Sequence, residues 1–141
     1  MKTTLKIGDS HVHKFTVTED KTVPHLYPES PEFRAMPKVF ATGFLVGLVE
    51  WACIEALKPH LDPGEGSVGT AINISHLAAT PPGMQVTVTV TCTAVSGRGT
   101  EWRVEARDER DLICEGTHGR AIVAWDRFLA RLAGKAQSVA T

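Results

Sequence analysis

A strict alternation of apolar and polar side chains runs through residues 84–95. Every second position is apolar and the positions between them are polar, mostly threonine; the apolar set is Met84, Val86, Val88, Val90, Cys92 and Ala94. A period of two is typical of an antiparallel strand with one buried face and one face in water. The pattern therefore predicts a half-buried strand over this range.

The remainder of the second half continues in the same way. Residues 100–107 alternate again, with apolar side chains opposite glutamate and arginine. The turn sequences TPPG, SGRG and DERD separate these two stretches from further strands predicted over residues 69–79 and 112–125. We expect a meander of antiparallel strands, closed by a short amphipathic helix around residues 126–133.

The first half has a different character. Residues 11–18 predict a strand, and residues 24–37 hold so many prolines that a shaped loop is expected in place of regular helix or central strand. The segment FATGFLVGLVEWACIEALKPHL carries apolar side chains at helical spacing on nearly all sides, which predicts a buried helix ended by Pro59. The next stretch, LDPGEGSVG, is predicted to be a glycine-rich connector.

These elements together predict a fold. A helix that is apolar all round needs a sheet wrapped around it, and strands with one wet face supply that sheet. We therefore predict the α+β class in a hot-dog arrangement, a long antiparallel sheet around a central buried helix, as one domain over residues 1–141. A single layer of this kind leaves an edge strand and part of the helix uncovered, which favours a homodimer.

Composition and charge exclude several classes of function. The formal net charge is -1 and no basic stripe is present, so nucleic acid is not an expected partner. The cysteines Cys53, Cys92 and Cys114 are widely spaced and form no C-x-x-C, as expected for reduced thiols. The N-terminus has no apolar signal region, and no apolar run is long enough to span a membrane. We expect a cytoplasmic protein without membrane contact.

Glu50 is the strongest single candidate for chemistry. It is the only charged residue between Phe40 and Ile54 on the predicted buried helix, and an unpaired buried carboxylate is costly. Thr42 lies near the start of the same helix, where it fits either a helix cap or a group that holds a thioester carbonyl beside the free helix amides. The helical rise separates these two residues by about 12 Å, so they touch only if the chain bends or a partner subunit intervenes.

Histidines and an arginine supply further candidates. His76 sits in AINISHLAAT with few polar neighbours, which fits a core or interface histidine, or an acid–base group if Glu50 is near. His118 and Arg120 share one partly buried face of the last strand, where an arginine needs an anionic partner. His11 and His13 form an H-x-H without further ligands at zinc-like spacing, so we expect no metal site there.

Five stretches carry a resemblance that covers nearly the whole chain up to the C-terminal tail. TVPHLYPESPEF, VFATGFLVGLVEWAC, LDPGEGSVGTAI, SHLAATPPG and EGTHGRAIV are similar to the fluoroacetyl-CoA thioesterase family of the hot-dog superfamily. The resemblance implies a catalytic set at Thr42, Glu50 and His76. It also implies that a glycine and an arginine, here Gly69 and Arg120, lie near the α-substituent of the acyl group.

The same resemblance implies a lid within the proline-rich segment, with two phenylalanines over the pocket. Phe33 matches one of them, and Met36 stands at the position of the other. Methionine is flexible and makes a poorer rigid plug than phenylalanine. The identity of the favoured acyl group depends on this departure.

The residues and the resemblance together predict hydrolysis of a short acyl-CoA, foremost fluoroacetyl-CoA to fluoroacetate and CoA, which would detoxify fluoroacetate. In this interpretation Glu50 is the nucleophile or the base for water, Thr42 and helix amides polarise the thioester, and His76 moves protons. No metal or cofactor is expected, and the site is expected at the subunit boundary of the homodimer. The alternatives are a thioesterase for another short acyl-CoA, a hydratase, and a non-catalytic acyl-CoA-binding dimer.

Overall fold

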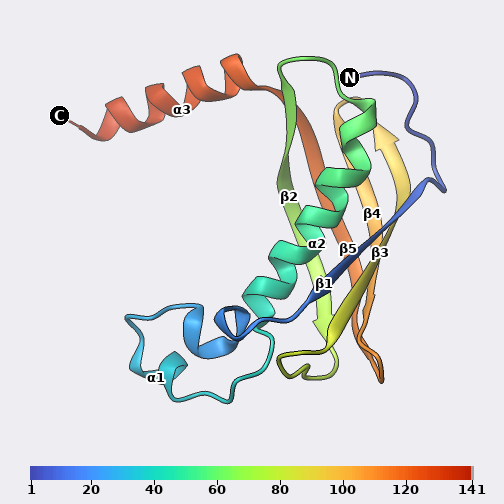
Figure 1. Cartoon of the computed structure of the whole chain (residues 1–141). Coiled ribbons are helices and arrows are strands. Elements are labelled where there is room, and N and C mark those ends of the chain that lie inside the picture. The colour runs from blue at the N-terminus through green and yellow to red at the C-terminus, as the bar shows by residue number, and fades with distance from the viewer. Residues whose placement is uncertain (141) are drawn as a thin grey trace.

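A single five-stranded antiparallel sheet forms the body of the computed structural model, which describes residues 1–140 (Figure 1). The strand order is β1-β3-β4-β5-β2. The strands are β1 (Ser10–Thr16), β2 (Glu65–His76), β3 (Gln85–Ser96), β4 (Gly99–Arg107) and β5 (Leu112–Ala124). The two edges of the sheet are therefore β1 and β2, and the predicted strands are all present.

One long helix, α2 (Thr42–Leu57), crosses one face of this sheet (Figure 1). Its buried side chains meet the buried face of the strands, which includes Val86, Val88, Val90 and Trp102. The predicted alternation of β3 and β4 is thus confirmed. The helix is not buried all round, however, because the side chains of Trp51 and Ile54 are 47% and 43% exposed. An apolar surface of this kind suits a contact with another chain.

Strand β2 differs from the prediction at its start. It begins at Glu65, so half of the expected glycine-rich connector is strand. The reason is local: a Cβ at Gly66 would lie 2.0 Å from the Trp125 ring, so this position must be glycine even within a strand. A register shift between Gly69 and Ala71 interrupts the pairing of β2 with β5. Such a bulge inserts one unpaired residue and bends the strand.

The proline-rich segment, residues 19–39, also contains more structure than a loop. It holds two 3-10 turns, Glu19–Lys21 and Val23–His25, and the short helix α1 (Pro31–Arg34). Two of its prolines, Pro24 and Pro31, occupy first-turn positions, where their missing N–H is tolerated. We call residues 19–39 the α1 segment.

The C-terminal helix α3 (Trp125–Val139) is longer than predicted and does not pack along the body. It extends away from the sheet, as Figure 1 shows in orange and red. Alanine, leucine, arginine and lysine are frequent in its sequence, and these residues have high helix propensity. Among the described residues, no helix is long and apolar enough to cross a membrane.

Candidate functional site

Arg120 on β5 and Glu50 on α2 form an ion pair between the sheet and the helix. Arg120 is 3% exposed, and its Nη1 donates to Glu50 Oε1 at 3.0 Å. The Glu50 side chain is 39% exposed, so one end of the pair remains open to water. The sequence-based expectation that a buried arginine needs an anionic partner is met by this contact.

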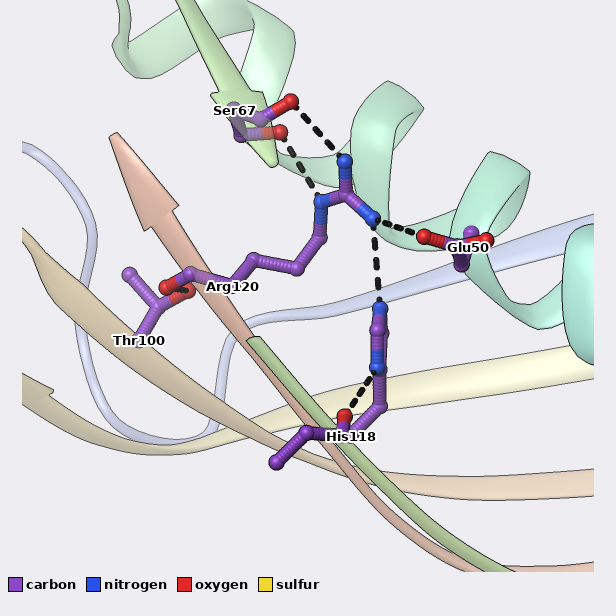
Figure 2. Close-up of polar contacts among 6 residues, drawn as sticks. Glu50, Ser67, Thr100, His118 and Arg120 are labelled. Carbon is purple, nitrogen blue, oxygen red and sulfur yellow. Dashed lines mark hydrogen bonds and ion pairs between the residues drawn. The ribbon is translucent and has the colours of Figure 1, made fainter. Parts of the chain in front are cut away.

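The other two nitrogens of the Arg120 guanidinium are also hydrogen-bonded. Nε donates to Ser67 Oγ and Nη2 donates to the Ser67 carbonyl oxygen, both at 2.9 Å, and Figure 2 shows the guanidinium held between Ser67 and Glu50. Nη1 also lies 3.3 Å from His118 Nε2. Bonds on all three nitrogens fix the plane of the guanidinium.

His118 supports the arginine as a neutral ring. Its Nδ1 lies 2.7 Å from the carbonyl oxygen of Ala71, which can only accept, so Nδ1 carries the proton and Nε2 accepts from Arg120. Burial lowers the pKa of His118, and the nearby Arg120 charge lowers it further. Near neutral pH the ring is therefore an acceptor and not a second cation.

Gly69 lets the Glu50 carboxylate of this ion pair approach strand β2 closely. It pairs with Arg120 across the β2–β5 ladder, and a Cβ at this position would lie 2.6 Å from Glu50 Oε1. Any side chain here would displace the carboxylate. The structure thus brings Glu50, Gly69 and Arg120 together.

A second pair, Thr42 and His76, lies at the other end of β2. Thr42 Oγ1 is 2.8 Å from His76 Nδ1. The helix cap is Ala41 and not Thr42, so the interpretation of Thr42 as a cap is wrong and its hydroxyl serves the histidine. Burial lowers the pKa of His76, and among the described residues its Nε2 is buried without a hydrogen-bond partner.

The start of α2 presents amide groups beside Thr42. The first helical hydrogen bond runs from Leu45 N to Ala41 O, so the N–H groups of the three preceding residues are not used by that helix. These groups and the helix dipole favour a negative oxygen at this place. A Cβ at Gly43 would lie 2.9 Å from the Leu26 side chain, so the α1 segment packs directly on this helix start.

Phe33 and Met36 both lie in the α1 segment, at the Thr42 end of α2 (Figure 1). The Phe33 ring stacks on Tyr27 with centroids 5.7 Å apart, and Met36 is 50% exposed. The segment that the resemblance assigns to a lid therefore holds an ordered aromatic pair, Tyr27 and Phe33, and an exposed methionine, Met36.

Within one chain the five candidate residues around α2 form two groups and not one. Glu50, Gly69 and Arg120 are at mid-helix, whereas Thr42 and His76 are at its N-terminal end, about 12 Å away by the helical rise. Sequence reasoning missed Ser67, because it fell in the predicted connector. Extending the strand to Glu65 would have placed Ser67 on the same face as Gly69.

The remaining candidates have structural explanations. His11 Nε2 and His13 Nδ1 lie 3.2 Å and 2.6 Å from Glu55 Oε1, so both histidines face one carboxylate. Burial raises the pKa of the Cys53 thiol to about 12, so it stays protonated and packs in the core. No group of three or more histidine, cysteine, aspartate or glutamate side chains in residues 1–140 is arranged so that it could hold a metal ion.

Comparison with known proteins identifies the family. The fluoroacetyl-CoA-specific thioesterase family matches residues 17–126. A fluoroacetyl-CoA thioesterase of Streptantibioticus cattleyicolor is 54% identical over 135 residues, 96% of this chain and 97% of the other. A crystal structure of a single-residue variant of the fluoroacetyl-CoA-specific thioesterase, in complex with fluoroacetate and CoA, is 56% identical, with a TM-score of 0.87 over 88% of this chain and 99% of that chain.

A more distant structure supports the same fold. A thioesterase superfamily member of Thermus thermophilus is 28% identical, with a TM-score of 0.81 over 94% of this chain and 96% of that chain. The predicted α+β hot-dog fold is confirmed, since the five-stranded sheet and its packed helix match hot-dog thioesterase structures. By sequence and by fold, this chain belongs to the fluoroacetyl-CoA-specific thioesterase family.

Proposed function

We propose that this protein hydrolyses fluoroacetyl-CoA to fluoroacetate and CoA, and so detoxifies fluoroacetate. The observation that carries the proposal is the fixed Arg120 guanidinium, which lies beside the Glu50 carboxylate at the point where Gly69 lets that carboxylate approach the strand. A small acyl group bound against this ion pair would have its α-substituent next to a cation and its acyl carbon within reach of a carboxylate. The activity of the relatives supports the same substrate.

The chemistry assigns each group one task. Glu50 attacks the acyl carbon or takes a proton from the water that attacks it. The Thr42 hydroxyl and the amides at the start of α2 donate to the thioester oxygen as it becomes negative. The C–S bond then breaks and CoA leaves as a thiolate, which takes a proton relayed by the neutral His76. Where Glu50 is the nucleophile, water then hydrolyses the mixed anhydride and releases fluoroacetate. No metal or bound cofactor is part of this scheme.

The two groups meet if the protein is a homodimer paired along β2. An antiparallel two-fold contact between two β2 edges places the start of one strand beside the end of the other. Gly69 with its Glu50–Arg120 pair then approaches the partner subunit's His76 and Thr42. The exposed side chains of residues 69–73 on β2 and of Trp51 on α2 supply the uncovered surface for this contact.

The cellular location that fits best is the cytoplasm. All three cysteines are free and buried, with Cys114 raised in pKa to about 11 by burial. Thiols that never pair are typical of proteins in a reducing compartment. The CoA thioester substrate fits the same compartment.

Thiol release tests the proposal directly. We expect the wild-type protein to free CoA from fluoroacetyl-CoA with a higher kcat than from acetyl-CoA. One small atom adds only about 1–3 kcal/mol of binding, or roughly 10- to 200-fold, so a larger preference must arise in the chemical step. A rise in Tm with CoA but no thiol release would show a binding protein and overturn the assignment.

Another short acyl-CoA is the second candidate substrate, and Met36 is the observation that favours it. A side chain that is 50% exposed and flexible closes the pocket less firmly than an aromatic ring would. A panel of short acyl-CoAs decides between the two. A preference for a longer acyl group over fluoroacetyl would replace the first proposal with this one.

A further inference from the structure

Helix α3 leaves the body at a defined angle but then has almost nothing to pack on. Trp125 sits directly over Gly66, and Trp125 N donates to the Gly64 carbonyl oxygen at 3.0 Å. These contacts fix the exit of the helix at the first residues of β2. From there α3 runs outward past the β2 edge (Figure 1).

The exposed helix has one apolar face. Its apolar side chains recur at helical spacing: Trp125, Phe128, Leu129, Leu132 and Ala136. Leu129 and Leu132 are 58% and 51% exposed, and no α3 residue is buried. A stable helix with such a face is normally covered, because an isolated helix of this length is marginal in water.

A hollow beneath α3 has a positive charge balance. It lies between the helix and the ends of β2 and β5, and its lining includes Phe128, Leu132 and Ile122. Its basic side chains outnumber its acidic ones: Arg98, Arg127, Arg131 and Lys135 against Glu65 and Asp126. The occupant that fits is an apolar segment with acidic groups.

The α1 segment has that chemistry and projects from the opposite end of the same edge. Tyr27 and Met36 are 55% and 50% exposed, and the charged side chains between them, Glu29, Glu32 and Arg34, are exposed as well, so acidic groups outnumber basic ones there. The segment is anchored at the end of β2, through the Thr42–His76 contact and a hydrogen bond from Phe40 N to Thr80 O. In Figure 1 it extends to the same side as α3, at the other end of the molecule.

A two-fold axis at the β2 edge would bring α3 of one subunit next to the α1 segment of the other. The rotation exchanges the two ends of β2, so the α1 segment of one subunit comes to the end from which α3 of the other subunit projects. The charges are complementary, and both surfaces are apolar at the centre. The contact occurs twice and is continuous with the β2 edge.

We propose that α3 of each subunit packs on the α1 segment of its partner and holds that segment over the partner's substrate pocket. This inference rests on the homodimer that is part of the proposed function. Each pocket would then be covered by a segment that the other subunit's last helix keeps in place. The C-terminal helix becomes a determinant of how firmly the pocket closes.

Cross-linking tests the contact. A variant with Leu129→Cys and Tyr27→Cys should give a covalent dimer with a short bis-maleimide, since the native cysteines are all buried. Each single variant is the control, because like positions on the two subunits lie at opposite ends. Within one chain the two sites are separated by the length of β2, roughly 40 Å, which a short linker cannot span. A dimer by light scattering without the covalent product would overturn the inference and leave thiol release intact. A monomer would overturn the inference together with the dimer.

Kinetics test the consequence. Leu132→Glu places a charge on the apolar face, and we expect KM to rise by up to about tenfold, the factor for one lost leucine contact. Gln137→Glu adds the same charge on the polar face and should leave KM unchanged. Equal KM values in both variants would overturn the role in closure. Wild-type binding to phosphatidylglycerol vesicles that Leu132→Glu abolishes, without cross-linking, would assign α3 to a membrane surface instead.

Discussion

The Arg120 cluster and the Thr42–His76 pair differ in how completely one chain builds them. In the cluster, each guanidinium nitrogen has a partner, and the supporting His118 is 2% exposed. In the pair, a single 2.8 Å contact joins an exposed threonine to a histidine whose Nε2 has no partner among the described residues. One region is complete before substrate arrives, and the other is left with unused hydrogen-bonding capacity.

The contrast teaches where fixed geometry is needed. A group that senses a dipole works best when its position does not change during the reaction. A group that passes a proton must exchange partners, so an unfilled position on the ring is useful there. Substitutions in the Arg120 cluster and in the Thr42–His76 pair should therefore affect the reaction in different ways.

The largest effect is expected from Glu50→Gln. The amide still accepts a hydrogen bond from Arg120, so the fold should persist, but it cannot act as a nucleophile or base. We expect kcat to fall by about 10²-fold or more. Glu55→Gln is the matched control on the same helix, and it should retain most activity. A near wild-type kcat in Glu50→Gln would show that the carboxylate serves structure alone.

Thr42 variants separate the hydroxyl from the methyl group. Thr42→Ala removes the contact with His76 and should lower kcat by roughly 10- to 100-fold, the range of a lost oriented donor. Thr42→Ser keeps the hydroxyl and should retain substantial activity. If serine and alanine variants have the same kcat, the hydroxyl has no part in the reaction.

Arg120→Ala should narrow the preference for fluoroacetyl-CoA over acetyl-CoA, and the change should appear mainly in kcat. It should also cost stability, by about 3 kcal/mol or less, because the Glu50 carboxylate can still reach water. Separate kcat and KM values for both substrates check the first effect, and urea unfolding checks the second. An unchanged preference would remove Arg120 from the recognition of fluorine.

The smallest effect is a pH dependence that belongs to His76. Burial lowers its pKa below the ordinary value near 6.5, so the neutral ring that relays protons is present at pH 7 and is lost as the pH falls through the lowered pKa. We expect kcat to decline on that acidic limb. His76→Ala should lower the rate and flatten the limb. A limb that survives in this variant would belong to another group.

Much of the sheet could be predicted from the sequence, because burial on one face imposes a period of two. Val86, Val88 and Val90 are fully buried as that period requires. The cost of buried charge predicted an anionic partner for Arg120, but it did not identify Glu50 as that partner. Ser67 could not be found, because its glycine-rich surroundings predict a loop and only the packing of Trp125 on Gly66 reveals a strand.

Other features were hidden for different physical reasons. Thr42 was open to two interpretations because a threonine before a helix usually caps it, and only the coordinates show that Ala41 takes that position. Helix α3 is longer than predicted because its apolar face is not covered by the rest of the chain, so no burial pattern marks where the helix ends.

The bulge in β2 determines which face of the sheet carries the candidate site residues of that strand. Gly69 and His76 are separated by an odd number of positions, so in a regular strand their side chains would point to opposite faces. The extra residue between Gly69 and Ala71 restores them to the same face, the one that carries α2. If Thr70 instead paired in a regular ladder, Gly69 would stay in front of Glu50 but His76 would turn toward the outer surface of the sheet. The unpaired Thr70 thus keeps Gly69 and His76 on the same face of the sheet.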